Sequence, residues 1–140
     1  MNQYDSKYML IRLLCIMKII NNKTYNQSFE PKLYPGQPQI LVFLKHNQGI
    51  SQKELSKKHK SRPASISGIL QKLEKQDLIK RETDINDKRI LRVYLTPTGE
   101  KLANQADEFL NHISEIMFKN FTKEEKECYL NILDKISNNL

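Results

Sequence analysis

The stretch SQKELSKKHKSRPASISGILQKLEKQDLIKRETDINDKRILRVYLTPTG, residues 51–99, decides the fold of this chain. It divides into a short helix, a turn, a second helix, a first strand, a polar tip and a second strand, over residues 51–59, 60–62, 63–76, 77–83, 84–89 and 90–95. Two helices followed by a hairpin are typical of a winged helix-turn-helix, in which one helix enters a groove of DNA.

Local signals support each of these boundaries. Ser51 and Glu54 have the spacing of a capping box, which predicts that the first helix starts at Ser51. Pro63 suits a first helical position, because the missing amide hydrogen is not needed there. Thr96 is expected to cap a later helix that has Pro97 in its first turn.

The second helix has two different faces. At about 100° per residue its apolar side chains fall on one side, namely Ile66, Ile69, Leu70 and Leu73. The opposite side holds Ala64, Gly68, Gln71 and Lys75, flanked by Ser65, Ser67 and Lys72. Small residues in the first two turns would allow close approach to base edges. An ordinary amphipathic helix with a solvated outer side is the alternative, and the position before a basic hairpin favours the DNA interpretation.

The positive charge is concentrated in the same stretch. Residues 51–92 hold twelve Lys and Arg against six Asp and Glu, whereas the rest of the chain holds eleven against ten. Most of the net charge of +7 therefore lies where the fold predicts a DNA surface.

The segments on either side of this stretch are also expected to be helical. Residues 5–28 predict a first helix that is apolar around most of its circumference, which suggests burial against a second subunit. Breakers mark residues 31–38 as a connector, and residues 39–47 predict a short helix. A long helix to about Asn120 and a last helix capped by Thr122 complete the chain.

Several protein classes are excluded at this level. The apolar run of residues 9–20 is too short to cross a bilayer and is interrupted by two charges, and no signal peptide pattern is present. A cytoplasmic protein without a membrane partner is therefore expected. The two cysteines and three histidines match no metal spacing, and no catalytic arrangement or glycine-rich phosphate loop is found, so we expect no enzyme activity, metal or cofactor.

The chain resembles the MarR family of bacterial transcriptional regulators. The resemblance rests on LEKQDLIKR at residues 73–81 and on a wing signature formed by Asp87, Arg89, Val93, Leu95, Thr96 and Gly99. It implies a mainly α fold with a small β-hairpin wing, as a single domain over residues 1–140. The winged helix-turn-helix lobe would occupy residues 38–99, with dimerisation helices in 1–30 and 100–140. It also implies a homodimer that represses transcription at a pseudo-palindromic site in double-stranded DNA.

The resemblance assigns roles to particular residues. The base-proximal positions would be Ala64, Ser65, Ser67 and Gly68, with Gln71 and Lys72 at the edge or on phosphate and Arg62 just before the helix. Arg89, held by Asp87, would enter the minor groove with Lys88 near the backbone, and the amides of Ser51 and Gln52 would suit a phosphate oxygen. Gly68 departs from the longer side chains of many relatives, so the bases recognised do not follow from the family.

Sensing and other functions remain open alternatives. Tyr25, Phe29, Tyr34 and His46 are candidates for a cleft that binds a small aromatic effector, or for core packing. A branch of the family senses peroxides through a cysteine of the first helix, the place of Cys15 here. The apolar neighbours of Cys15 favour an inert core thiol. A winged helix that binds a protein partner is the competing function from another class.

Overall fold

The computed structural model describes residues 2, 5–25 and 29–140, with the side chain of Tyr25 outside that description. The elements in chain order are α1 (Ser6–Tyr25), α2 (Gln37–His46), β1 (Ile50–Ser51), α3 (Gln52–Lys58), α4 (Pro63–Lys75), β2 (Ile79–Thr83), β3 (Leu91–Leu95), α5 (Pro97–Met117) and α6 (Lys123–Asn139). The mainly helical fold with a hairpin wing is thus confirmed. The end of the predicted first helix, residues 26–28, lies outside the described residues.

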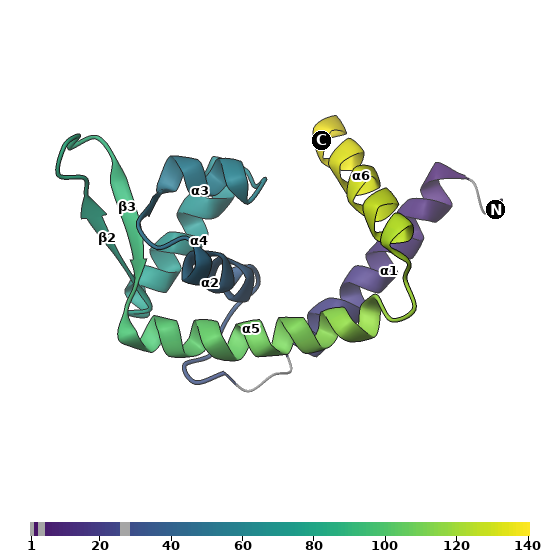
Figure 1. Ribbon diagram of the computed structural model, residues 1–140, viewed down its shortest axis with the longest axis horizontal. Helices are drawn as coiled ribbons and strands as arrows, with labels where there is room; N and C mark the ends of the chain where they lie inside the picture. The colour runs from purple at the N-terminus through teal and green to yellow at the C-terminus, as the bar shows by residue number, and fades with distance from the viewer. Residues whose placement is uncertain (1, 3–4, 26–28) are drawn as a thin grey trace.

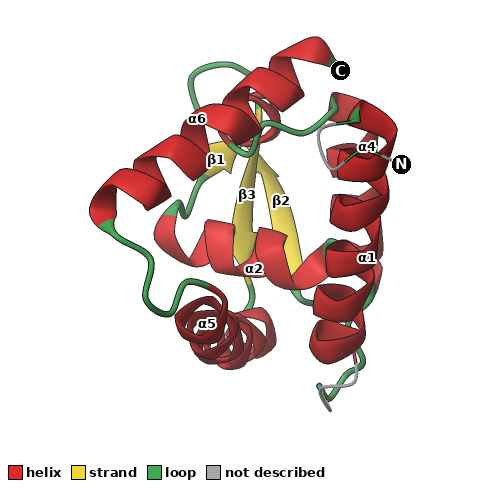
Figure 2. Ribbon diagram, turned by 90° about the vertical axis from the view of Figure 1, so that its right-hand side faces the viewer, coloured by secondary structure: helices red, strands yellow, loops and turns green. Residues whose placement is uncertain are grey.

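Helix α5 connects two differently built parts of the molecule (Figure 1). Near its start, α2, α3, α4 and the sheet gather into one lobe, and the β2–β3 hairpin projects from that lobe as the wing. Near its end lie α1 and α6, which carry the two termini. Figure 2 shows α2 crossing in front of the sheet.

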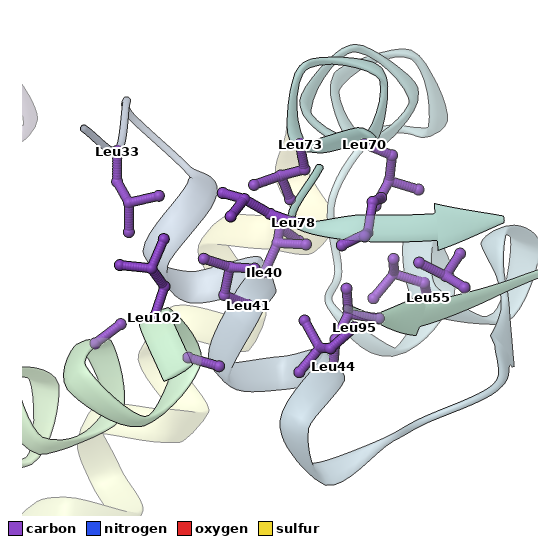
Figure 3. Packing of buried hydrophobic residues seen from close by; sticks show 14 of the residues in the cluster. Leu33, Ile40, Leu41, Leu44, Leu55, Leu70, Leu73, Leu78, Leu95 and Leu102 are labelled. Atoms are coloured by element: carbon purple, nitrogen blue, oxygen red, sulfur yellow. The ribbon is translucent and has the colours of Figure 1, made fainter. Parts of the chain in front are cut away.

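The hydrophobic core belongs to the lobe (Figure 3). Helix α2 packs against α5, and α3 packs against α4. The side chains between them are fully or almost fully buried, including Ile40, Leu41, Leu44, Leu55, Ile66, Leu70, Leu73, Leu78, Val93 and Leu102. These positions recur at the spacing of one helix face or one strand side, so the amphipathic pattern builds the lobe.

The sheet has three strands rather than the two predicted. Its order is β1-β3-β2, and both pairings are antiparallel. The additional strand β1 is only two residues long, with Ile50 opposite Val93 and Ser51 opposite Arg92. A two-residue strand has no alternation to detect, so only its pairing with β3 reveals it.

Helix starts follow the predicted capping signals, with one shift. The capping boxes at Ser51 and at Thr122 are both present, and Thr96 caps α5 by accepting from the amide of Gly99. Helix α2 starts at Gln37, two residues earlier than predicted, and includes Pro38. Proline is tolerated in a first turn because no carbonyl of the preceding turn needs its amide, so Pro38 starts this helix instead of ending the connector.

Gly99 is required where α5 approaches the beginning of β2. A Cβ atom placed on Gly99 would lie 1.8 Å from the carbonyl oxygen of Leu78. The same carbonyl accepts the amide of Thr96 at 3.0 Å, and the Thr96 hydroxyl donates to the carbonyl of Asp77. These contacts attach the wing to the start of α5, which gives two residues of the wing signature a physical role.

The terminal helices differ from the lobe in burial. Most apolar side chains of α1 are exposed, and α6 has no buried residue. Within the described residues, neither helix packs extensively against another element. Among all the described residues, no helix has the length and apolar content needed to cross a membrane.

Candidate nucleic-acid interface

The outer face of α4 is open to solvent along its first three turns. Ala64, Ser65, Ser67, Gln71 and Lys72 are exposed and Gly68 is half-buried. On the inner side Ile66, Leu70 and Leu73 are fully buried, and Ile69 packs against the same core. The structure therefore brings the predicted contact residues of this helix onto one accessible surface.

The first turns of this surface are low in profile. A Cβ atom at Gly68 would meet nothing within 4 Å, so the glycine leaves an open notch in the face. Arg62 stands at the N-cap with extended backbone and an exposed side chain, and it makes no capping bond. The free guanidinium is thus placed beside the end of α4 that carries the small residues.

The wing tip carries a cation whose geometry is set within the chain. The backbone amide and Nε of Arg89 both donate to Oδ1 of Asp87 at 3.0 Å, and Nη2 donates to Oδ2 at 3.0 Å. The side chain of Arg89 is nevertheless 90% exposed. The guanidinium lowers the pKa of Asp87, so this carboxylate stays charged at neutral pH. Lys88 is exposed beside the pair.

The start of α3 differs from the phosphate site expected at the amides of Ser51 and Gln52. The amide of Ser51 donates to Oε2 of Glu54 at 3.2 Å, within the capping box. This bond and a second one from the Ser51 hydroxyl lower the pKa of Glu54, so the carboxylate is anionic there. The Ser51 amide is therefore already satisfied, and an anion sits where a phosphate oxygen was expected. Gln52 is half-buried, and its Oε1 accepts from Arg81 at 3.4 Å.

A groove of about 950 Å³ separates α3 from the wing. Lys53 and Lys57 line it on the α3 side, and Asp87 and Arg89 line it on the wing side. The two lysines lie one helical turn apart and are exposed. They were not among the predicted contact residues. Their spacing of four was the signal in the sequence, because it places both on one face of a short basic helix.

The residues considered for an effector cleft differ in how exposed they are. Phe29 belongs to the buried core of the lobe. Tyr34 is 49% exposed, with the Nζ of Lys32 5.6 Å from its ring centre. His46 is largely exposed and lies 3.8 Å from Asp107 of α5. The side chain of Tyr25 lies outside the described residues.

Cys15 is exposed on α1, and not buried in a core as its apolar neighbours suggested. Those neighbours are themselves exposed, which explains the difference.

Among the described residues, no three His, Cys, Asp or Glu side chains are grouped as a metal ion would require. A second hollow, of about 500 Å³, lies between α5 and α6 and is lined by Phe118, Tyr129 and Leu130 among others.

Comparison with known proteins identifies relatives of the whole arrangement. The family model described as MarR family matches residues 33–91. The uncharacterized HTH-type transcriptional regulator YybA of Bacillus subtilis is 30% identical over 105 residues, covering 75% of this chain and 70% of YybA. The structure of a MarR protein from Peptoclostridium difficile superposes with a TM-score of 0.79 at 30% identity, over 99% of this chain and 90% of that one.

The similar structures include complexes with DNA. A MarR-family transcriptional regulator from Listeria monocytogenes, complexed with 26mer DNA, has a TM-score of 0.76 and is 25% identical to this chain. The match covers 93% of this chain and 87% of the Listeria protein. The chain described here belongs to the MarR family and is a winged helix-turn-helix transcriptional regulator.

Proposed function

We propose that this protein is a homodimeric repressor that binds a pseudo-palindromic DNA sequence. The observation that carries the proposal is the pairing of two exposed features, the small-residue face of α4 and the Arg89 side chain on the wing. A helix of low profile suits base edges in the major groove, and a projecting guanidinium suits the minor groove. Lys53 and Lys57, in the groove between α3 and the wing, would contact phosphates.

Dimerisation is supported by the terminal helices. Leu10, Leu14 and Ile19 of α1 and Leu130 and Ile132 of α6 are each at least half exposed. Exposed large apolar side chains in this number are typical of a protein interface. A two-fold dimer would present two α4 helices about one turn of DNA apart, which is why a pseudo-palindrome is expected.

The test is binding to DNA from the region upstream of the protein's own gene, with a scrambled duplex of equal length as control. We expect selective binding whose affinity falls steeply with salt, because each neutralised phosphate releases counterions. The Arg89→Ala variant should bind about 5- to 100-fold more weakly. Unchanged affinity in a folded Arg89→Ala protein would contradict the assignment of the wing.

Weak and equal binding to both duplexes calls for selection from a random DNA library. A selected site would retain the proposed function with a distant operator. Failure to select any site would favour the alternative, in which the winged helix binds a protein partner.

The same assay tests regulation. Release of the duplex by small aromatic acids would support an effector site, and release by organic hydroperoxide that is lost in Cys15→Ser would support peroxide sensing. The exposed face of α1 that contains Cys15 is the surface the proposed dimer buries. That position does not favour a reactive thiol.

A further inference from the structure

The tip of the wing is organised around the carboxylate of Asp84. Its Oδ1 accepts the amides of Asn86 at 2.8 Å and Asp87 at 2.9 Å. Backbone bonds between Asp84 and Ile90, and between Ile90 and Asp87, close the same turn. This side chain is only 13% exposed, although it stands in a polar loop. The turn that carries Asp87, and through it Arg89, is therefore built on one largely buried carboxylate.

Arg92 of β3 connects that carboxylate to the lobe. Its Nε donates to Oδ2 of Asp84, and its Nη1 donates to the carbonyl oxygen of Gly49 at 2.8 Å. Gly49 directly precedes β1, and its amide donates to the carbonyl of Val93 at 2.9 Å. Arg92 thus joins the wing tip to the segment that leads into the helix-turn-helix.

We propose that Arg92 is a positioning residue for DNA binding, which acts by holding the Asp84 turn and so fixing where Arg89 points. This inference rests on the proposed function. The bonds form an uninterrupted series from Gly49 through Arg92, Asp84 and Asp87 to Arg89. Two charge-assisted pairs, Arg92 with Asp84 and Asp87 with Arg89, are joined in this series by the bond from the Asp87 amide to Asp84. Hydrogen bonds to ionised groups order their partners together, so breaking the series in the middle frees the far end.

A direct phosphate contact is the competing role for Arg92. Its Nε and Nη1 are already used inside the chain, and about two thirds of the side chain is buried, with 36% exposed. Arg89 is 90% exposed and stands at the far end of the series. The geometry therefore favours an indirect role for Arg92 and a direct one for Arg89.

A double-mutant cycle on the full chain separates these roles. Affinity for the selected duplex is measured for the wild type, Arg92→Met, Arg89→Ala and the double variant. We expect Arg92→Met to weaken binding about tenfold in the wild-type background and less than twofold when Arg89 is already alanine. The same tenfold loss in both backgrounds, or no loss in either, would overturn the proposal.

Two further variants keep the test informative if Arg92→Met folds poorly. Asp84→Asn breaks the same series at the next residue and should show the same dependence on Arg89. Arg92→Lys keeps the charge and should recover part of the affinity. If Asp84→Asn caused the same loss of DNA affinity with Arg89 present and with Arg89→Ala, that result alone would overturn the proposal.

Arg81→Met is the matched control. Arg81 lies on the neighbouring strand β2, and its guanidinium is bonded to Glu74 of α4 rather than to the wing tip. Any loss of affinity in Arg81→Met should therefore persist when Arg89 is alanine. Amide hydrogen exchange adds a local readout, because Arg92→Met should speed exchange at Asn86 and Asp87 but not within α4. Unchanged exchange at the tip would also overturn the proposal.

If no DNA sequence is enriched by the wild-type protein, or if Arg89→Ala leaves DNA affinity unchanged, the proposed function itself fails. If both behave as expected but Arg92 and Arg89 act additively, only this inference fails.

Discussion

The lobe and the terminal helices use the same residue types in opposite ways. Leu41, Leu70 and Leu73 are fully buried inside the lobe, whereas Leu14 of α1 is 54% exposed and Leu130 of α6 is 59% exposed. The lobe therefore satisfies its apolar side chains within one chain, and the terminal helices do not. The difference fits the proposed dimer, in which a partner chain would cover the apolar side chains of α1 and α6.

The strongest test of this difference introduces a charge on α1. Leu14→Glu should convert the proposed dimer into a monomer, because a carboxylate buried without a partner costs roughly 3–5 kcal/mol. Sedimentation velocity at several protein concentrations measures the change. Leu14→Met keeps the volume and the apolar character, and it should remain dimeric. Equal sedimentation of the glutamate variant and the wild type would remove α1 from the interface.

A leucine-to-alanine pair compares the two regions directly. Leu41→Ala should lower the free energy of unfolding by about 2–5 kcal/mol, because it opens a cavity in a packed core. Leu14→Ala, measured at a concentration where the chain is monomeric, should change it by less than about 0.5 kcal/mol. Urea denaturation followed by circular dichroism gives both values. Similar losses would mean that α1 shares the core of the lobe.

Substitutions at two glycines should change stability by less than Leu41→Ala does, and in opposite directions. Gly99→Ala should destabilise the lobe by about 1–3 kcal/mol, because the new methyl group overlaps the carbonyl oxygen of Leu78 and forces the backbone apart. Gly68→Ala should stabilise α4 by up to about 1 kcal/mol, since its Cβ enters open space. Thermal unfolding checks both signs. A gain in stability for Gly99→Ala would contradict the close approach described here.

The smallest expected effect is on the pH dependence of the stability of the lobe. Burial lowers the pKa of His59, whose ring packs edge-on against Phe43. The unfolded chain therefore binds a proton more readily than the folded chain, and stability should fall as pH decreases through the ordinary histidine value near 6.5. Comparison of His59→Gln with the wild type isolates this contribution, because the variant should show a flatter pH dependence. Parallel pH profiles would assign the dependence to other groups.

Much of the lobe could be predicted because its signals are local. Capping boxes and helix faces depend on residues three or four positions apart, so they are visible in the chain itself. The pairing of β1 with β3 and the Arg92 bond to Gly49 join residues 41 to 43 positions apart, and they become visible only in the folded sheet. The same holds for the wing. The Asp87–Arg89 pair could be predicted because its members are two residues apart, whereas the Asp84–Arg92 pair could not, because its members meet only across the hairpin.

The terminal helices show a different limit. The apolar sequence of α1 indicated burial, and the isolated chain leaves it exposed. Cys15 follows the same pattern, since its expected apolar surroundings exist only if another surface covers α1. A single sequence therefore predicts that such a helix needs a partner, without showing which atoms cover it.

Helix α5 links the lobe to the terminal helices. Its 21 residues correspond to a rod about 31 Å long. Its first turns are embedded in the lobe through Leu102, Ala103 and Ala106, and its last turn lies beside α6 (Figure 1). If α5 behaves as a rigid rod, a tilt of roughly 6° at its far end would displace the lobe at its start by about 3 Å. This is close to the rise of about 3.4 Å between stacked bases, so in the proposed dimer such a tilt would move a lobe by a distance comparable to one base step.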